Sequence, residues 1–121
     1  MCKFIGIDIS KQVFDVSFLL NDTWKHAVLE NGKLGFKKLL KLIGEEDVVV
    51  MEASGTYYLP LAEFLFNAEI KVVVENPLVI KRYSQSKLKR AKTDKADSKV
   101  IAEYAQKNLE DLKYWNPDSA E

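Results

Sequence analysis

The segment Lys3-Phe4-Ile5-Gly6-Ile7-Asp8 decides the fold of this chain. It is apolar on both faces, which is typical of a strand buried in the middle of a sheet. A turn-like stretch, residues 9–12, follows it, and apolar residues then alternate with others over Val13–Leu20. That alternation predicts a second strand. Because the link between the two is so short, we expect them to run antiparallel.

The pattern continues outward from these two strands. Asn21-Asp22 marks another turn, and Thr23–Leu29 predicts a third strand, so the chain should open with an antiparallel meander. The period then changes to that of a helix, which Gly44 is expected to end. The apolar face of this helix is predicted to contain Leu34, Phe36, Leu39, Leu40 and Ile43.

Strands and helices alternate in the rest of the sequence. Val48–Met51 predicts a doubly buried fourth strand, and Asn76 is a candidate N-cap. The remaining predicted elements are a helix over Leu59–Asn67, a strand over Ile70–Val74, a basic helix over Leu78–Ser86 and a helix over Asp94–Lys107. Three strands, then helix and strand twice, then two helices, is the element order of the ribonuclease H-like fold. We therefore predict an α/β fold in which helices flank a five-stranded mixed sheet.

Length and composition set limits on function. A chain of 121 residues suits one domain with one ordinary core. Its apolar runs are shorter than the roughly 20 residues of a membrane span, and its start predicts no signal peptide. With Cys2 and His26 the only residues of their kinds, neither an internal disulfide nor a Cys/His zinc site can form. The single cysteine suits a reducing cytoplasm, so we expect a cytoplasmic protein with no membrane partner.

Charge is unevenly distributed along a chain whose formal net charge is zero. Residues 81–95 contain seven basic side chains and one acid, a net charge of +6. This segment is a candidate nucleic-acid contact, although a solvated helix face explains most lysine-rich runs. The candidate residues are Lys81, Arg82, Lys87, Lys89, Arg90, Lys92 and Lys95.

Four acidic residues predict a metal site. Asp8 and Glu52 end predicted parallel strands, and such ends meet at the same edge of a sheet. Neighbouring strands are about 4.8 Å apart, so the two carboxylates would repel each other without a cation between them. Asp94 and Asp97 are three residues apart and can share a helix face. Oxygen ligands of this kind suit Mg²⁺ or Mn²⁺ in phosphodiester chemistry. A helix N-terminus or a turn would explain some of these acids without a metal.

Three motifs carry a family resemblance. They are Gly6-Ile7-Asp8-Ile9-Ser10-Lys11, then Met51-Glu52-Ala53-Ser54-Gly55-Thr56-Tyr57, then Lys92-Thr93-Asp94-Lys95-Ala96-Asp97. In this order they resemble the N-terminal domain of the DEDD-type insertion-sequence transposases, a group that includes Piv-like site-specific DNA invertases. That domain is similar to the RuvC Holliday-junction resolvase and has a ribonuclease H-like fold. One departure is Ser98, where the family usually has a small residue such as alanine.

The resemblance implies a metal-dependent DNA transposase or site-specific recombinase. It implies that Asp8, Glu52, Asp94 and Asp97 are the catalytic, metal-binding residues, and that Mg²⁺ or Mn²⁺ is the cofactor. It also implies DNA, a structured guide RNA and homo-oligomers as partners, and a prokaryotic source. Full-length members continue into a second domain with a nucleophilic serine. Residues 1–121 are therefore expected to be a single RuvC-like N-terminal domain, without that C-terminal domain and without full activity alone.

Three other functions stay open at this stage. The chain can be a self-sufficient nuclease of the RuvC or ribonuclease H kind, or a non-catalytic nucleic-acid-binding assembly domain. It can also be one lobe of an actin-like sugar kinase or ATPase, because Gly6-Ile7-Asp8-Ile9-Ser10 resembles the first phosphate loop of such proteins. The extra glycines of that loop are absent here.

Overall fold

The computed structural model describes residues 3–53, 55–87 and 98–117. Its elements follow the order expected from the sequence. They are β1 (Phe4–Ile9), β2 (Val13–Leu20), β3 (Thr23–Glu30), α1 (Lys33–Leu40), β4 (Val48–Glu52), α2 (Leu59–Asn67), β5 (Lys71–Glu75), α3 (Pro77–Lys87), α4 (Ser98–Lys107) and the short 3₁₀ helix η1 (Leu109–Asp111).

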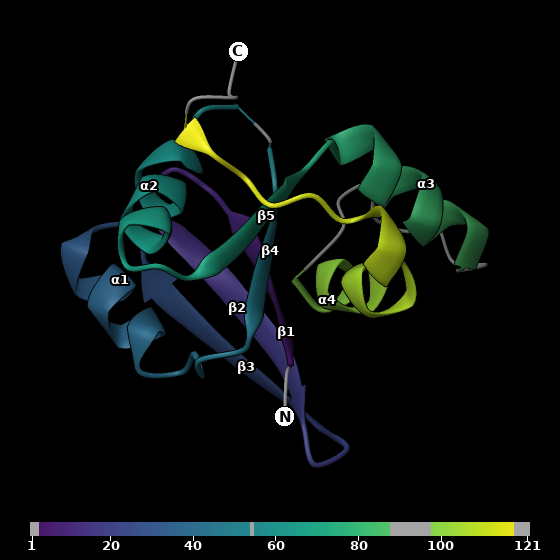
Figure 1. Cartoon of the computed structure of the whole chain (residues 1–121), viewed down its shortest axis with the longest axis horizontal. Helices are drawn as coiled ribbons and strands as arrows, with labels where there is room; N and C mark the ends of the chain where they lie inside the picture. Colours follow the sequence, from purple (N-terminus) through teal and green to yellow (C-terminus); the bar gives the residue numbers. More distant parts are fainter. Residues whose placement is uncertain (1–2, 54, 88–97, 118–121) are drawn as a thin grey trace.

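The strands form one mixed sheet in the order β3-β2-β1-β4-β5 (Figure 1). β1 pairs with β2 antiparallel and with β4 parallel, β2 pairs with β3 antiparallel, and β4 pairs with β5 parallel. The meander and the parallel arrangement of the later strands are therefore confirmed. β1 lies at the centre, which agrees with its apolar sequence on both faces.

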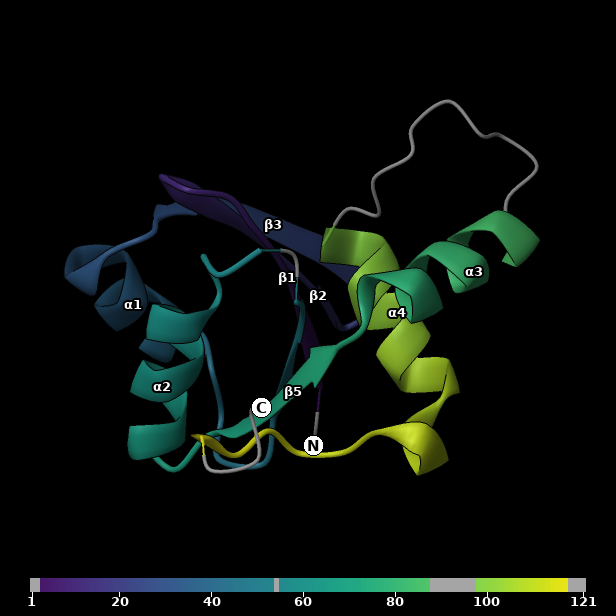
Figure 2. The same cartoon turned by 90° about the horizontal axis from the view of Figure 1, so that it is seen from above.

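Helices cover both faces of this sheet. α1 and α2 lie together on one face, and α3 and α4 lie on the other (Figures 1 and 2). Each face has its own apolar core. The α1/α2 core includes Ile5, Ile7, Phe14, Val16, Phe36, Leu39, Val49, Met51, Leu61 and Leu65. The α3/α4 core includes Val48, Val50, Val73, Ile80, Ile101 and Tyr104.

Gly6 allows α4 to lie directly on β1. A Cβ atom at this position would be 2.1 Å from the carbonyl oxygen of Ser98 and 2.6 Å from the backbone nitrogen of Ala102. The same helix end is bound to the sheet by a hydrogen bond of 2.6 Å between the hydroxyl groups of Ser17 and Ser98. Both serines are buried, so the first turn of α4 is held over β1 and β2.

Two details of the predicted helices were wrong. Leu34 is 65% exposed and is not part of the buried face of α1. The reason is that a helix turns about 100° per residue, which places Leu34 on the side opposite Phe36. In addition, α1 ends at Leu40, before Gly44. The predicted start of the last helix, at Asp94, lies outside the described residues.

The amino ends of the parallel strands are joined by a buried ion pair. The Lys3 ammonium lies 2.6 Å from an oxygen of the Asp47 carboxylate, whose side chain is 2% exposed. Asp47 also accepts hydrogen bonds from the backbone N–H groups of Lys3 and Gly44. Burial disfavours ionisation of Asp47, but these hydrogen bonds outweigh it and lower the pKa of the carboxyl. Asp47 is therefore a structural residue.

Candidate metal centre and nucleic-acid interface

Asp8 and Glu52 lie at equivalent positions on two neighbouring parallel strands. In the pairing of β1 with β4, Ile7 is opposite Met51, and Asp8 and Glu52 are the next residues on the two strands. The strands are parallel, so both carboxylates lie at the same carboxyl edge of the sheet. Neighbouring strands are about 4.8 Å apart. The expected adjacency of the two acids is thus supported by the strand register.

Both acids belong to the face of the sheet that α4 covers. Gly6 contacts α4 directly, and side chains two residues apart on a strand share a face, so Asp8 lies on this face as well. The same reasoning places Glu52 there, because Val50 belongs to the α3/α4 core. Asp8 is buried and Glu52 is half-buried. A carboxylate pair in such a position has the oxygen donors that a divalent cation prefers.

The other two predicted ligands, Asp94 and Asp97, lie outside the described residues. Within residues 3–53, 55–87 and 98–117, no group of three or more His, Cys, Asp or Glu side chains could hold a metal ion. The described part of the chain therefore contributes a pair of candidate ligands, Asp8 and Glu52. Ser98, the residue after Asp97 in the sequence, is described and contacts β1 at Gly6.

Glu75 ends β5 in direct register with Glu52, but its carboxylate has another role. It accepts a hydrogen bond of 3.1 Å from the Tyr104 hydroxyl and another of 3.1 Å from the backbone N–H of Asn76. Burial and the negative charge of Glu75 together raise the pKa of Tyr104 to about 12. Glu75 therefore links β5 to α4.

Sequence reasoning missed one acid at this edge. Asp15 on β2 is opposite Asp8 in the strand register and is half-buried rather than directed fully to solvent. The alternation of β2 places Asp15 on the same face as Ser17, which contacts α4. The local sequence holds no signal for this, because the same alternation is typical of an antiparallel strand whose polar face is solvated.

A single asparagine joins the loops of the carboxyl edge. The Asn31 amide donates hydrogen bonds to the carbonyl oxygens of Ser10 at 2.9 Å and Tyr57 at 3.4 Å. The backbone N–H of Asn31 donates to the carbonyl oxygen of Gln12 at 2.8 Å. These bonds hold the turn after β1, the end of β3 and the loop before α2 together. Tyr57, which is 46% exposed, is available for stacking at this edge.

The predicted basic segment is described only in its first part. Lys81 and Arg82 are exposed on α3, and Lys87 is the last residue of that helix. The helix begins as expected, because the side-chain oxygen of Asn76 accepts a hydrogen bond of 2.8 Å from the backbone N–H of Leu78. The other four predicted contacts, Lys89, Arg90, Lys92 and Lys95, lie outside the described residues.

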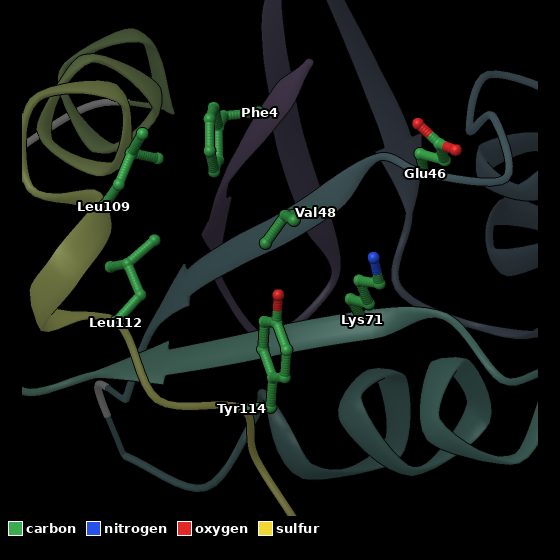
Figure 3. A pocket seen from close by; sticks show the side chains of 7 residues that line it. All are labelled: Phe4, Glu46, Val48, Lys71, Leu109, Leu112 and Tyr114. Carbon is green, nitrogen blue, oxygen red and sulfur yellow. The ribbon is translucent and has the colours of Figure 1, made fainter. Parts of the chain in front are cut away.

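Two cavities among the described residues lie at the other end of the sheet. One of about 530 Å³ lies between the amino ends of β1, β4 and β5 and the C-terminal segment, where Phe4, Val48 and Tyr114 surround it (Figure 3). A second, of about 540 Å³, shares Lys71 and Tyr114 with the first. Both are lined mainly by apolar groups, whereas the candidate carboxylates Asp8 and Glu52 lie at the opposite edge.

Solved structures with the same fold support the class of the domain. RuvC of T. thermophilus in complex with a Holliday junction substrate matches 95% of this chain and 100% of its own chain, with a TM-score of 0.62 and 13% identity. A second structure of Thermus thermophilus RuvC matches 93% of this chain and 99% of its own, with a TM-score of 0.59 and 14% identity. The domain therefore has the RuvC-like form of the ribonuclease H-like fold, as predicted.

Sequence comparison gives the family. A family model described as "Transposase", of the DEDD IS110 type, matches residues 5–121. The pilin gene-inverting proteins of Moraxella bovis and Moraxella lacunata are 36% and 35% identical to the chain over 96% of its length. The chain belongs to the DEDD transposase family. It spans 37% of the length of each of these relatives.

No helix in the described ranges combines the length and the apolar character that a transmembrane segment needs.

Proposed function

We propose that this chain is the metal-binding domain of a DNA transposase, or site-specific recombinase, that cleaves and transfers DNA strands. Asp8, Glu52, Asp94 and Asp97 are the carboxylates that hold Mg²⁺ or Mn²⁺ in this proposal. The observation that carries it is the pairing of Asp8 and Glu52 at the carboxyl ends of two adjacent parallel strands. Family membership over residues 5–121 supports the reaction class.

The position of α4 supports the assignment of the second acid pair. Ser98 lies over Gly6, and Gly6 is two residues from Asp8 on the same face of β1, a separation of about 6.6 Å. Asp97 is bonded to Ser98, and consecutive Cα atoms are about 3.8 Å apart. Chain connectivity therefore favours a site shared by Asp8 and Asp97. Asp94 belongs to the same sequence motif as Asp97, Lys92-Thr93-Asp94-Lys95-Ala96-Asp97.

The carboxylates have a defined task in this reaction. A bound divalent cation would neutralise phosphate charge. It would also stabilise the negative charge on the attacking and leaving oxygens of phosphoryl transfer. Asp8 and Glu52 would fix the cation at the carboxyl edge, because both extend from paired strands of a rigid sheet. Lys81, Arg82 and the rest of the basic segment would hold the DNA backbone beside this edge.

The wider organisation of the protein is also a proposal. Residues 1–121 form a single RuvC-like N-terminal domain, and a serine in a C-terminal domain of the complete protein attacks the scissile phosphate. A structured guide RNA, homo-oligomers and a cytoplasmic location in a prokaryote stay predictions from the sequence. The proposal is consistent with a chain that spans 37% of its Moraxella relatives.

Calorimetric titration with Mn²⁺ tests the site. Asp8→Asn and Glu52→Gln each replace a charged oxygen donor by an amide and are expected to weaken Mn²⁺ binding by at least about tenfold. Glu63→Gln is the matched control, because Glu63 is an exposed residue of α2. Unchanged Mn²⁺ affinity in both site variants would refute the proposed metal centre.

A cleavage assay separates this proposal from the alternatives. The 121-residue chain is incubated with Mn²⁺ and either branched DNA or an RNA–DNA hybrid. Metal-dependent cleavage that is lost in Glu52→Gln would identify a self-sufficient nuclease and contradict the need for a second domain. Steeply salt-dependent nucleic-acid binding without any metal binding would instead identify a non-catalytic assembly domain.

A further inference from the structure

Helix α1 and the residue that caps its C-terminal end, Lys41, carry a strip of lysines that the proposed metal centre does not use. Lys33, Lys37, Lys38 and Lys41 are all exposed, and α1 contains no acidic residue. Within the described part of the chain, no carboxylate lies within ion-pairing distance of any of the four. They form the second concentration of positive charge in the sequence, after residues 81–95.

Two features of the strip oppose the formation of α1 as an isolated helix, although Lys37 and Lys38 in the last turn interact favourably with the helix dipole. Lys33 is in the first turn, where the helix dipole disfavours a cation and no acid compensates. Lys33 and Lys37, and then Lys37 and Lys41, are four residues apart, and like charges at this spacing repel by about 0.2–0.5 kcal/mol per pair. An eight-residue helix has little stability of its own. An anionic partner would relieve these costs.

The strip begins at the edge of the sheet that bears Asp8 and Glu52. β2 is antiparallel to both β1 and β3, so β3 ends at the same edge as β1. Asn31, just after β3, is hydrogen-bonded to the carbonyl oxygens of Ser10 and Tyr57 in the loops of that edge. α1 therefore starts beside the candidate site, and the line Lys33, Lys37 and Lys41 leads away from it. Figure 2 shows α1 on the opposite side of the sheet from α3.

The length of this strip matches a nucleic-acid backbone. Lys33 and Lys41 are separated by eight residues, or about 12 Å along the helix axis. One strand of a DNA duplex presents a phosphate about every 3.4 Å of axis, so three to four phosphates fall within that length. Three lysines spaced by about 6 Å can each neutralise a phosphate on one strand.

We propose that α1 is a second DNA-binding surface, on which Lys33, Lys37 and Lys41 contact the backbone of duplex DNA. The duplex crosses the carboxyl edge of the sheet and reaches the face opposite α3. The inference rests on the proposed function, because it takes DNA as the substrate of this domain. It adds a contact surface outside residues 81–95 and outside the carboxylate site.

The test compares two triple variants by fluorescence anisotropy with a short DNA duplex over a range of salt concentrations, in EDTA so that metal binding has no part. K33Q/K37Q/K41Q is expected to reduce the slope of log K against log salt by about 2.7, which is 0.9 for each lost phosphate contact. Affinity near 0.1 M salt should fall by at least about tenfold. The control, K71Q/K107Q/K113Q, removes the same charge from exposed lysines and should leave the slope close to that of the unmodified chain.

The other outcomes of these binding measurements distinguish a failure of the α1 surface from a failure of the proposed function. If the unmodified chain binds DNA and the α1 variant keeps its slope and affinity, the α1 surface is refuted while the proposed function stands. If the unmodified chain does not bind DNA, the proposed function itself fails. If the α1 variant loses affinity for a structured RNA of equal length but not for DNA, the assignment to duplex DNA is wrong. Thermal melting controls for folding, and K33Q alone, with an expected slope change of about 0.9, repeats the test with minimal perturbation.

Discussion

Replacing Gly6 by alanine should disturb both the fold and the metal site. The new Cβ atom would lie 2.1 Å from the carbonyl oxygen of Ser98 and 2.6 Å from the backbone nitrogen of Ala102. Both are backbone atoms, so no side-chain rotation can make room, and α4 must move away from β1. Overpacking of this kind costs about 1–3 kcal/mol, and we expect the upper end of that range.

This loss of stability is large enough to measure directly. For a domain of this size, each kcal/mol lowers the melting temperature by about 4 °C, so Gly6→Ala should melt about 12 °C lower than the unmodified chain. Unfolding followed by circular dichroism, with heat and with urea, measures the change. Gly32→Ala is the control for steric overlap, because a Cβ there would have no neighbour closer than 3.9 Å; as the N-cap residue of α1 it should cost only about 0.5–1 kcal/mol.

The same substitution tests the connection between α4 and the metal site. If the contact at Gly6 positions the segment that ends at Ser98, Gly6→Ala should also weaken Mn²⁺ binding at a temperature where the variant is fully folded. A Gly6→Ala variant within about 1 kcal/mol of the control in stability would refute the close packing of α4 on β1. Normal stability with unchanged Mn²⁺ affinity would refute both parts of the reasoning.

Two further predictions follow from the ionisable groups. Asp47→Asn should cost about 1–3 kcal/mol by weakening the hydrogen bonds from Lys3 and Gly44. Folding lowers the pKa of Asp47. The ionised carboxylate therefore contributes to the free energy of unfolding above the unfolded pKa of about 3.9, and this contribution is lost as the pH falls through the folded value. In urea unfolding, the free energy of unfolding of Asp47→Asn should therefore depend less on pH in acid than that of the unmodified chain. Folding raises the pKa of Tyr104 to about 12, so its contribution to stability is present below about pH 10 and lost as the pH rises through the folded value. Tyr104→Phe should remove from the tyrosine absorbance titration the step that lies near the folded pKa of about 12. An unchanged titration would contradict the contact with Glu75.

The architecture of the sheet could be predicted because its signals are local. Alternation in Val13–Leu20 and the apolar run of Val48–Met51 indicate how many faces of each strand are buried. Short links then force antiparallel neighbours, and helical connections favour parallel ones. The position of Asp8 beside Glu52 follows from these two rules, so the arrangement of this pair of acids could be predicted from the sequence.

The missed features depend on contacts between distant residues. The close approach of Ser98 to Gly6 and the hydrogen bond between Ser17 and Ser98 cannot be derived from the period of either segment. The buried ion pair of Lys3 with Asp47 joins residues 44 positions apart. A charged residue in a loop normally faces solvent, and only the folded structure shows that Asp47 is covered.

The wrong assignment of Leu34 has a different origin. Leu34 was assigned to the same apolar face as Phe36, but a helix turns about 200° over two residues, so the two side chains lie on opposite sides. In the structure Leu34 is exposed among the lysines of α1. The helical period places Lys37, Lys38 and Lys41 outside the apolar face whether or not Leu34 belongs to it, and the structure shows these lysines exposed.

The central claim is that four carboxylates hold a divalent cation at the carboxyl edge of the sheet. A crystal of the chain soaked in Mn²⁺ tests it most directly through the anomalous scattering of the metal. We predict a peak bounded by oxygen atoms of Asp8 and Glu52, with Asp94 and Asp97 completing the site at about 2.0–2.2 Å. A well-ordered crystal with no peak beside Asp8 and Glu52, or with manganese bound by other residues instead, would contradict the account.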